Sequence, residues 1–296
     1  MWAGIWSNVI NVILNTIFTF VFHWGVFGIA FSTVIGRFGG LAYALRKAAG
    51  HEAARKAKGL PSVPGRDPRP YRALFVLAIP SALSYVLMAS ETGVVNWLLK
   101  GLEHGKEALA AYAIYYRVFH FVVMPAIAAS VAMLPFAARR IGERDLGAVR
   151  RGLRDAHVAG VAYAALAAPL LFFLAPPLAR HLSGSSVTIS YLIPAIRVVP
   201  LAALLATPFF LCRPVFEGMG RGRPGLTMSL LRYLVLAAPA AMLGLWLAPK
   251  LRISETLGLV CGLMAATAIS SLVFLFWTRR ALIGSAKGAQ NSSVAS

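Results

Sequence analysis

The chain has 296 residues, of which 58% are hydrophobic and only 13% are charged, and its mean hydropathy is +0.71. Soluble domains carry about 25% charged residues, so this composition excludes a water-soluble globular protein and predicts an all-α polytopic membrane protein. The net charge of +19 would suit nucleic-acid binding. The basic residues, however, lie between apolar segments, as they do in the cytoplasmic loops of membrane proteins, and we expect no nucleic-acid partner.

Eight segments are apolar and long enough to cross a bilayer, which requires roughly 20 mostly apolar residues. They cover about residues 1–22, 26–45, 73–99, 108–138, 156–179, 188–216, 226–247 and 255–278. The connections between these segments alternate in their content of Lys and Arg. Those on one side of the membrane, together with the C-terminal tail, carry 19, and those on the other side carry five. The positive-inside rule places the 19 in the cytoplasm. We therefore expect an integral protein of the bacterial inner membrane, surrounded by lipid, with both termini cytoplasmic.

The connection after the second span divides the chain, because it is basic and then rich in Pro and Gly. The predicted organisation is two helices over 1–48, a cytoplasmic linker over 49–71, a six-helix unit over 72–282 and a disordered cytoplasmic tail over 283–296. Similar runs, Gly28–Thr33 and Gly262–Thr267, follow a long helix and a short turn in each part. They indicate either a repeat, as is common in transporters, or small residues that let helices pack closely.

Several stretches together resemble one transporter family. NVILNTIFTFVFHWGVFGIAFSTVIGR, from Asn8, is similar to the fifth and sixth helices of multidrug and toxic compound extrusion (MATE) transporters. AIPSALSYVLMAS with ALAAYAIYYRV and MPAIAASVAMLPFAARRIGERD resembles the seventh and eighth helices, and PVFEGMGRGRPG resembles the turn after the tenth. The resemblance runs from about Ile5 to Arg280.

The resemblance implies a twelve-helix fold of two six-helix lobes with substrate held between them. This chain would supply two helices of an incomplete first lobe, the linker and a complete second lobe. The first four helices of the family would be missing, because the sequence is a fragment, has a misplaced start or comes from a truncated gene. Those four helices are then a candidate partner.

Two asparagines on the first span are the first candidate site residues. Asn11 and Asn15 are four residues apart and therefore share a helix face. The family often has an acid at the second position, within a coupling site, whereas Asn15 cannot exchange a proton. Alternatively, both amides hydrogen-bond across helices and serve packing.

Glu91 is the only acid placed well inside a predicted span. A carboxyl group there can exchange a proton or bind a cation. The resemblance puts the usual acid of this helix near Met88, one turn earlier, so Glu91 departs from the family pattern. The alternatives are an ion pair with Arg117 or Arg197, or a position near the wet outer surface.

Arg117, His120 and Arg197 are the remaining candidates, because charged and titratable groups inside spans usually face a partner or a water-filled cavity. An arginine does not release its proton, so these two can hold Glu91 or attract an anionic group. His120 can titrate near neutral pH or be a packed, hydrogen-bonded residue. Four prolines in the 188–216 span predict a bent helix that lines the cavity; they are Pro194, Pro200, Pro208 and Pro214.

Enzyme signatures are absent from the sequence, which has no Walker A, His-Glu-x-x-His or Gly-x-Ser-x-Gly pattern. Cys212 and Cys261 lie in apolar segments without zinc-ligand spacing, so we expect no metal site and no cofactor. The expected function is export of organic cations or amphiphilic drugs by alternating access, in antiport with Na⁺ or H⁺. The alternatives are a flippase for lipid-linked saccharides and a truncated, non-transporting membrane protein.

Overall fold

The structure is a computed structural model that describes residues 2–59 and 70–294. The chain separates into two compact units, Met1–Pro70 and Tyr71–Ser296, which are described here one at a time. Within the described residues, eight helical segments are long and apolar enough to cross a membrane, which confirms the predicted number of spans.

The first unit is a helical hairpin. It consists of α1 (Trp2–Thr16), a π-helix η1 (Ile17–Val21) and α2 (Gly25–Ala57). The chain reverses at His23 and Gly25, whose φ angles of 54° and 53° lie in the left-handed region, which favours glycine and is uncommon for other residues.

Small residues bring α1 and α2 together. The buried residues of α2 recur every four positions, which places them on one face of the helix; they are Gly28, Ser32, Gly36 and Gly40. A Cβ atom added at Gly36 would lie 2.8 Å from the carbonyl oxygen of Ser7, and one added at Gly40 would lie 2.8 Å from the Cβ of Ser7. The two backbones therefore approach to a separation that only glycine permits.

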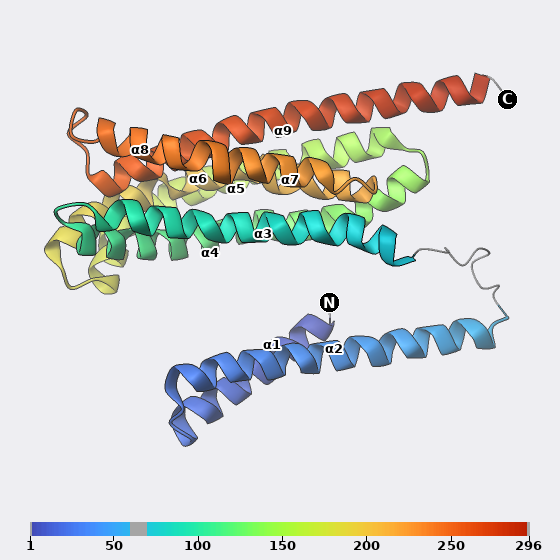
Figure 1. Cartoon of the computed structure of the whole chain (residues 1–296), viewed down its shortest axis with the longest axis horizontal. Coiled ribbons are helices and arrows are strands. Elements are labelled where there is room, and N and C mark those ends of the chain that lie inside the picture. The colour runs from blue at the N-terminus through green and yellow to red at the C-terminus, as the bar shows by residue number, and fades with distance from the viewer. Residues whose placement is uncertain (1, 60–69, 295–296) are drawn as a thin grey trace. The chain divides into compact units, whose positions relative to one another are not determined.

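The second unit is a bundle of long helices that run along roughly one axis (Figure 1). Its elements are α3 (Pro70–Lys100), α4 (Gly105–Gly142), α5 (Leu146–Leu182), α6 (Ser186–Gly218), α7 (Arg223–Ser229), a π-helix η2 (Leu230–Leu236), α8 (Ala237–Leu247) and α9 (Glu255–Val294). The consecutive α7, η2 and α8 form one span, Arg223–Leu247.

Helix α6 forms the core of this bundle. It contacts α4, α5 and α9, and 61% of the residues in its most apolar 18-residue stretch are buried. A membrane helix that is apolar on all sides and carries four prolines is stable here because neighbouring helices surround it. One direct link is the hydrogen bond that Ser271 of α9 donates to the carbonyl of Leu205, with an O···O distance of 2.7 Å.

Helices α8 and α9, orange and red in Figure 1, lie side by side. Glycines line their contact: a Cβ atom added at Gly258 would lie 2.5 Å from the carbonyl oxygen of Gly244, and one added at Gly262 would overlap the carbonyl of Ala240. The second of the two similar Gly-containing runs therefore begins at a close helix crossing, as the first does at the α2 face containing Gly28.

Helices extend beyond the apolar segments that predicted them. Helix α2 continues to Ala57, through the first part of the expected linker, because Ala, Lys, Arg and Glu are strong helix formers. Residues 60–69, the Pro-rich part of the linker, lie outside the described residues. Helix α9 continues through Val294, across the range expected to be a disordered tail.

Candidate functional site

The second unit contains a cavity of about 420 Å³ between α3, α4, α6 and η2. Six aromatic rings line it, alongside aliphatic side chains; they are those of Tyr85, Tyr116, Phe119, Phe209, Phe210 and Tyr233. Four charged side chains also line it: Glu91, Arg213, Glu217 and Arg232. A cavity of about 300–1,000 Å³ with apolar walls and a few polar groups has the character of a small-molecule binding site.

Glu91 projects from α3 into this lining and is partly exposed. None of the ion pairs between described residues includes Glu91. Arg232, which lines the same cavity from η2, acts on it electrostatically. The expected alternative of an ion pair with Arg117 or Arg197 is therefore not present in the described part of the chain. Met88, where the family pattern puts an acid, lines the same cavity one turn away.

Arg232 is the most deeply buried charge in the cavity wall, with only 7% of its surface exposed. Its Nη1 donates a hydrogen bond to the hydroxyl of Tyr233 at 3.1 Å. Its guanidinium lies 4.9 Å from the ring centre of Phe209 and 4.6 Å from that of Tyr233. Nε is buried and has no hydrogen-bond partner among the described residues. The positive charge is thus held by rings and one hydroxyl rather than by a carboxylate.

The other two charges form a network that joins α6 to α3. Arg213 donates from Nε to Glu217 Oε1 at 2.9 Å, and Ser81 Oγ donates to the same oxygen at 3.0 Å. Arg213 Nη2 also donates to the Ser81 carbonyl at 3.4 Å. The guanidinium lies 5.1 Å from the ring centre of Tyr85. This part of the cavity lining is therefore a charge-balanced, hydrogen-bonded pair.

His120 shares the cavity with Glu91, as candidate residues for one site should. Its ring lies 4.7 Å, centre to centre, from Tyr116. Its Nδ1 is buried without a hydrogen-bond partner among the described residues. The ring is therefore packed, as one alternative expected, but this nitrogen is not hydrogen-bonded.

Arg117 and Arg197 lie outside this lining. Arg117 is three residues before His120 on α4 yet is exposed. Arg197 on α6 is also exposed, and its guanidinium lies 4.3 Å from the ring centre of Phe172 on α5. The sequence predicted that both arginines lie within membrane spans, but it did not show the direction in which each side chain points.

Of the two asparagines of the first unit, Asn11 bonds across the hairpin to α2 and Asn15 bonds within its own helical segment. Asn11 Nδ2 donates to Thr33 Oγ1 at 3.1 Å and to Ser32 Oγ at 3.4 Å. Asn15 Oδ1 accepts a hydrogen bond from Thr19 Oγ1 at 3.3 Å. The bonds of Asn11 cross between helices as the packing alternative expects, whereas the bond of Asn15 does not.

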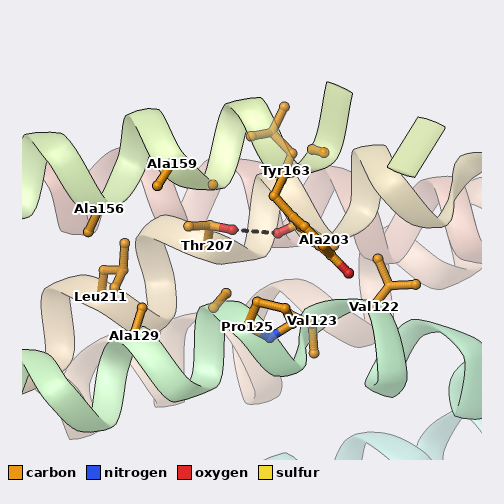
Figure 2. A pocket seen from close by; sticks show the side chains of 14 residues that line it. Val122, Val123, Pro125, Ala129, Ala156, Ala159, Tyr163, Ala203, Thr207 and Leu211 are labelled. Atoms are coloured by element: carbon orange, nitrogen blue, oxygen red, sulfur yellow. Dashed lines mark hydrogen bonds between the residues drawn. The ribbon is translucent and has the colours of Figure 1, made fainter. Parts of the chain in front are cut away.

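A second, smaller cavity of about 130 Å³ lies between α4, α5 and α6. Figure 2 shows Tyr163 extending from α5 into this space, and Thr207 hydrogen-bonded to the Ala203 carbonyl of its own helix at 2.8 Å. The remaining lining is apolar, largely Ala, Val, Leu and Pro. Without a charged group, this space is a packing gap rather than a candidate site for a charged substrate.

Three charged residues of the cavity lining, Arg213, Glu217 and Arg232, were not among the candidates from sequence. Arg213 and Arg232 are two of five arginines within apolar segments, and charge and depth alone do not separate them from Arg117 or Arg197. The prolines of α6 gave a better signal, because Pro214 does line the cavity. No group of three or more His, Cys, Asp or Glu side chains among the described residues is placed to hold a metal ion.

Comparison with known proteins identifies the fold. A sequence search of the curated proteins finds no match. Among solved structures, a Vibrio cholerae MATE transporter, VcmN, in its bent form is similar with a TM-score of 0.76 and 23% identity, over 95% of this chain and 61% of that one. A multidrug resistance MATE transporter in an outward-facing conformation has a TM-score of 0.80 and 18% identity, over 97% and 62%. A MATE protein in the straight conformation gives 0.82 and 18%, over 97% and 63%.

The chain thus spans less than two thirds of the length of these solved transporters. The family model MatE matches residues 80–243, which is more than half of the chain and includes all four charged residues of the larger cavity. The eight apolar helices make it an integral membrane protein, and it belongs to the MatE family of membrane transporters.

Proposed function

We propose that this protein is a secondary active exporter that antiports amphiphilic organic compounds against Na⁺ or H⁺ by alternating access. The large cavity of the second unit is the proposed binding site, and Glu91 is the proposed coupling acid. The observation that carries the proposal is a carboxyl group that lines a 420 Å³ aromatic cavity and has no ion-pair partner among the described residues.

An unpaired carboxylate at membrane depth is costly unless it takes up a proton or a cation. Either event neutralises the group, so a proton, Na⁺ and the cationic group of a substrate would compete for Glu91. Competition between substrate and coupling ion at one site is the thermodynamic basis of antiport, because each must leave before the other binds.

A flippase for lipid-linked saccharides is the second candidate that the sequence raised, since it would need a strongly cationic cavity. Two of the arginines that favoured it, Arg117 and Arg197, are exposed and outside the lining. The cavity itself carries two arginines and two glutamates, which gives no cationic excess. The exporter is therefore the better supported proposal.

The decisive experiment is drug accumulation in efflux-deficient cells that express Glu91→Gln in a version of the protein whose reading frame is extended upstream. Export should fall by about tenfold or more, because a charge-assisted contact worth about 1.5–3 kcal/mol is lost. Glu103→Gln is the matched control: Glu103 is exposed and outside the cavity lining, so the same change of charge should leave export at the wild-type level. Normal export by Glu91→Gln at normal expression would return Glu91 to a structural role.

We also propose the setting in which the protein works: the bacterial inner membrane, with both termini cytoplasmic. Four further helices are its proposed partner, since the chain matches about three fifths of the solved transporters. The accumulation assay should therefore compare the chain alone with a version whose reading frame is extended upstream. Export by the extended version alone supports the partner proposal, and equal export by both contradicts it.

A further inference from the structure

We propose that the large cavity selects zwitterionic compounds with an aromatic body, whose anionic group binds Arg232 and whose cationic group faces Glu91. This inference rests on the proposed function and specifies the substrate class of the same site. It depends on three features: the unsatisfied guanidinium, the charge balance of the lining and the arrangement of its rings.

The first feature is the unused binding capacity of Arg232. A guanidinium has five N–H donors and keeps its charge, yet among the described residues Arg232 hydrogen-bonds only to the neutral hydroxyl of Tyr233. Its Nε is buried without a partner among the described residues, and the side chain is only 7% exposed. A carboxylate or phosphate would complete this site, because both match the planar fork of the guanidinium in charge and geometry.

The second feature is the charge balance of the cavity. Arg213 and Glu217 neutralise each other through their 2.9 Å contact, which leaves Glu91 and Arg232 as the unpaired charges. They influence each other electrostatically but are not within ion-pair distance in the described structure. A ligand with a single charge satisfies one of the two groups and leaves the other unpaired in a weakly polar site. A ligand with both charges satisfies both.

The third feature is the set of aromatic rings in the same cavity wall. Tyr116 and Phe119 come from α4, Phe209 and Phe210 from α6, and Tyr233 from η2. Such surfaces favour flat aromatic bodies by offset and edge-to-face contacts. A volume of about 420 Å³ accommodates one molecule of drug size.

The test is direct binding of two dyes that differ by one charge. One is a rhodamine with a free carboxylate, which is zwitterionic; the other is its methyl ester, a cation of nearly the same shape. Fluorescence anisotropy with the purified chain in nanodiscs gives both dissociation constants. The wild-type protein should bind the carboxylate form about tenfold or more tightly than the ester, since only the carboxylate makes charge-assisted hydrogen bonds to Arg232.

Variants assign the preference to Arg232. Arg232→Gln should remove the tenfold preference, and Arg232→Lys should retain part of it, because Lys keeps the charge but not the fork. Arg280→Gln is the matched control: Arg280 is exposed and outside the lining, and its guanidinium also lies over a phenylalanine ring, Phe276, at 4.3 Å. The control should keep the wild-type preference.

The outcomes separate the two proposals. Equal affinity for the two dyes in the wild-type protein, or a preference unchanged in a folded Arg232→Gln, overturns the zwitterion proposal while leaving the exporter intact. If the folded protein binds neither dye, both the site and the proposed function are overturned. Circular dichroism and size-exclusion chromatography establish folding, and a loss of affinity for both dyes in Arg232→Gln with the ratio preserved assigns Arg232 a structural role.

Discussion

The close crossing of α8 and α9 makes a sharp prediction for Gly258→Ala. A Cβ atom at this position would lie 2.5 Å from the Gly244 carbonyl oxygen and 2.7 Å from the Cβ of Ala248. Ordinary contacts of this kind begin at 3.4 Å, so the two helices must separate by close to an ångström. Neither neighbour is the flexible end of a long side chain, and local rearrangement cannot absorb the added methyl group.

The size of the effect follows from two opposing contributions. Overpacking costs about 1–3 kcal/mol, and replacing Gly by Ala within a helix returns about 1 kcal/mol. Because the contact is too short by close to an ångström, we take the upper part of the overpacking range, about 2–3 kcal/mol, so the net destabilisation is about 1–2 kcal/mol. Each kcal/mol lowers Tm by about 2–4 °C in a protein of about 150–250 residues. We therefore expect Tm to fall by roughly 2–8 °C when thermal unfolding is followed by tryptophan fluorescence in detergent.

Gly93→Ala is the matched control, because a Cβ atom there has nothing within 4 Å in the described structure. With no clash, the better helix propensity of Ala should leave Tm unchanged or raise it slightly. If Gly258→Ala unfolds at the wild-type temperature, or if both variants lose stability equally, glycine packing does not hold α8 against α9 and the reasoning is refuted.

Two further predictions concern the ion pairs of the second unit. Glu217→Gln leaves the partly buried Arg213 without its carboxylate and should cost about 2–3 kcal/mol, below the value for a fully buried pair; a double-mutant cycle with Arg213→Gln should show coupling, and strict additivity would contradict it. At the end of α4, the hydrogen bond from Arg139, with help from Arg140, lowers the pKa of Glu143. The ionised carboxylate therefore stabilises the folded protein above its unfolded pKa of about 4.3, and this contribution is lost as pH falls through the lowered folded pKa. Wild-type protein should unfold at a higher Tm than Glu143→Gln at neutral pH, and the two proteins should unfold at the same Tm at about pH 3. A difference in Tm that persists in acid would exclude this ion pair as its cause.

Hydropathy predicted the spans because burial in lipid acts on whole segments, and an apolar run such as 108–138 leaves no other choice. The observed α4, Gly105–Gly142, extends beyond that run at both ends. Helices do not end where the bilayer does, so polar residues with good helix propensity continue them past the apolar boundary, as at Ala57 in α2.

The direction of single side chains was much less predictable. Glu91 and His120 reach one cavity, whereas Arg117, only three residues from His120, does not. In a soluble helix the apolar face marks the core, but in a membrane helix lipid and core are both apolar. A charge within a span then predicts that the residue has a polar environment, but not where that environment is. Only the packing of α3, α4, α6 and η2 shows which arginines share a cavity with Glu91.

The π-helix η2 affects more than its own seven residues. Hydrogen bonds between residues five apart make its turns wider than those of an α-helix, so each residue after it is offset from the register that a uniform repeat of 3.6 would assign. If Leu230–Leu236 were a regular α-helix of the same length, α8 would be turned by roughly 100° relative to α7, the rotation of about one residue. The span would still cross the membrane, but Arg232 could no longer face the cavity while Gly244 meets α9. The irregular segment is therefore what allows a single helix to serve a polar site at one level and a tight backbone crossing at another.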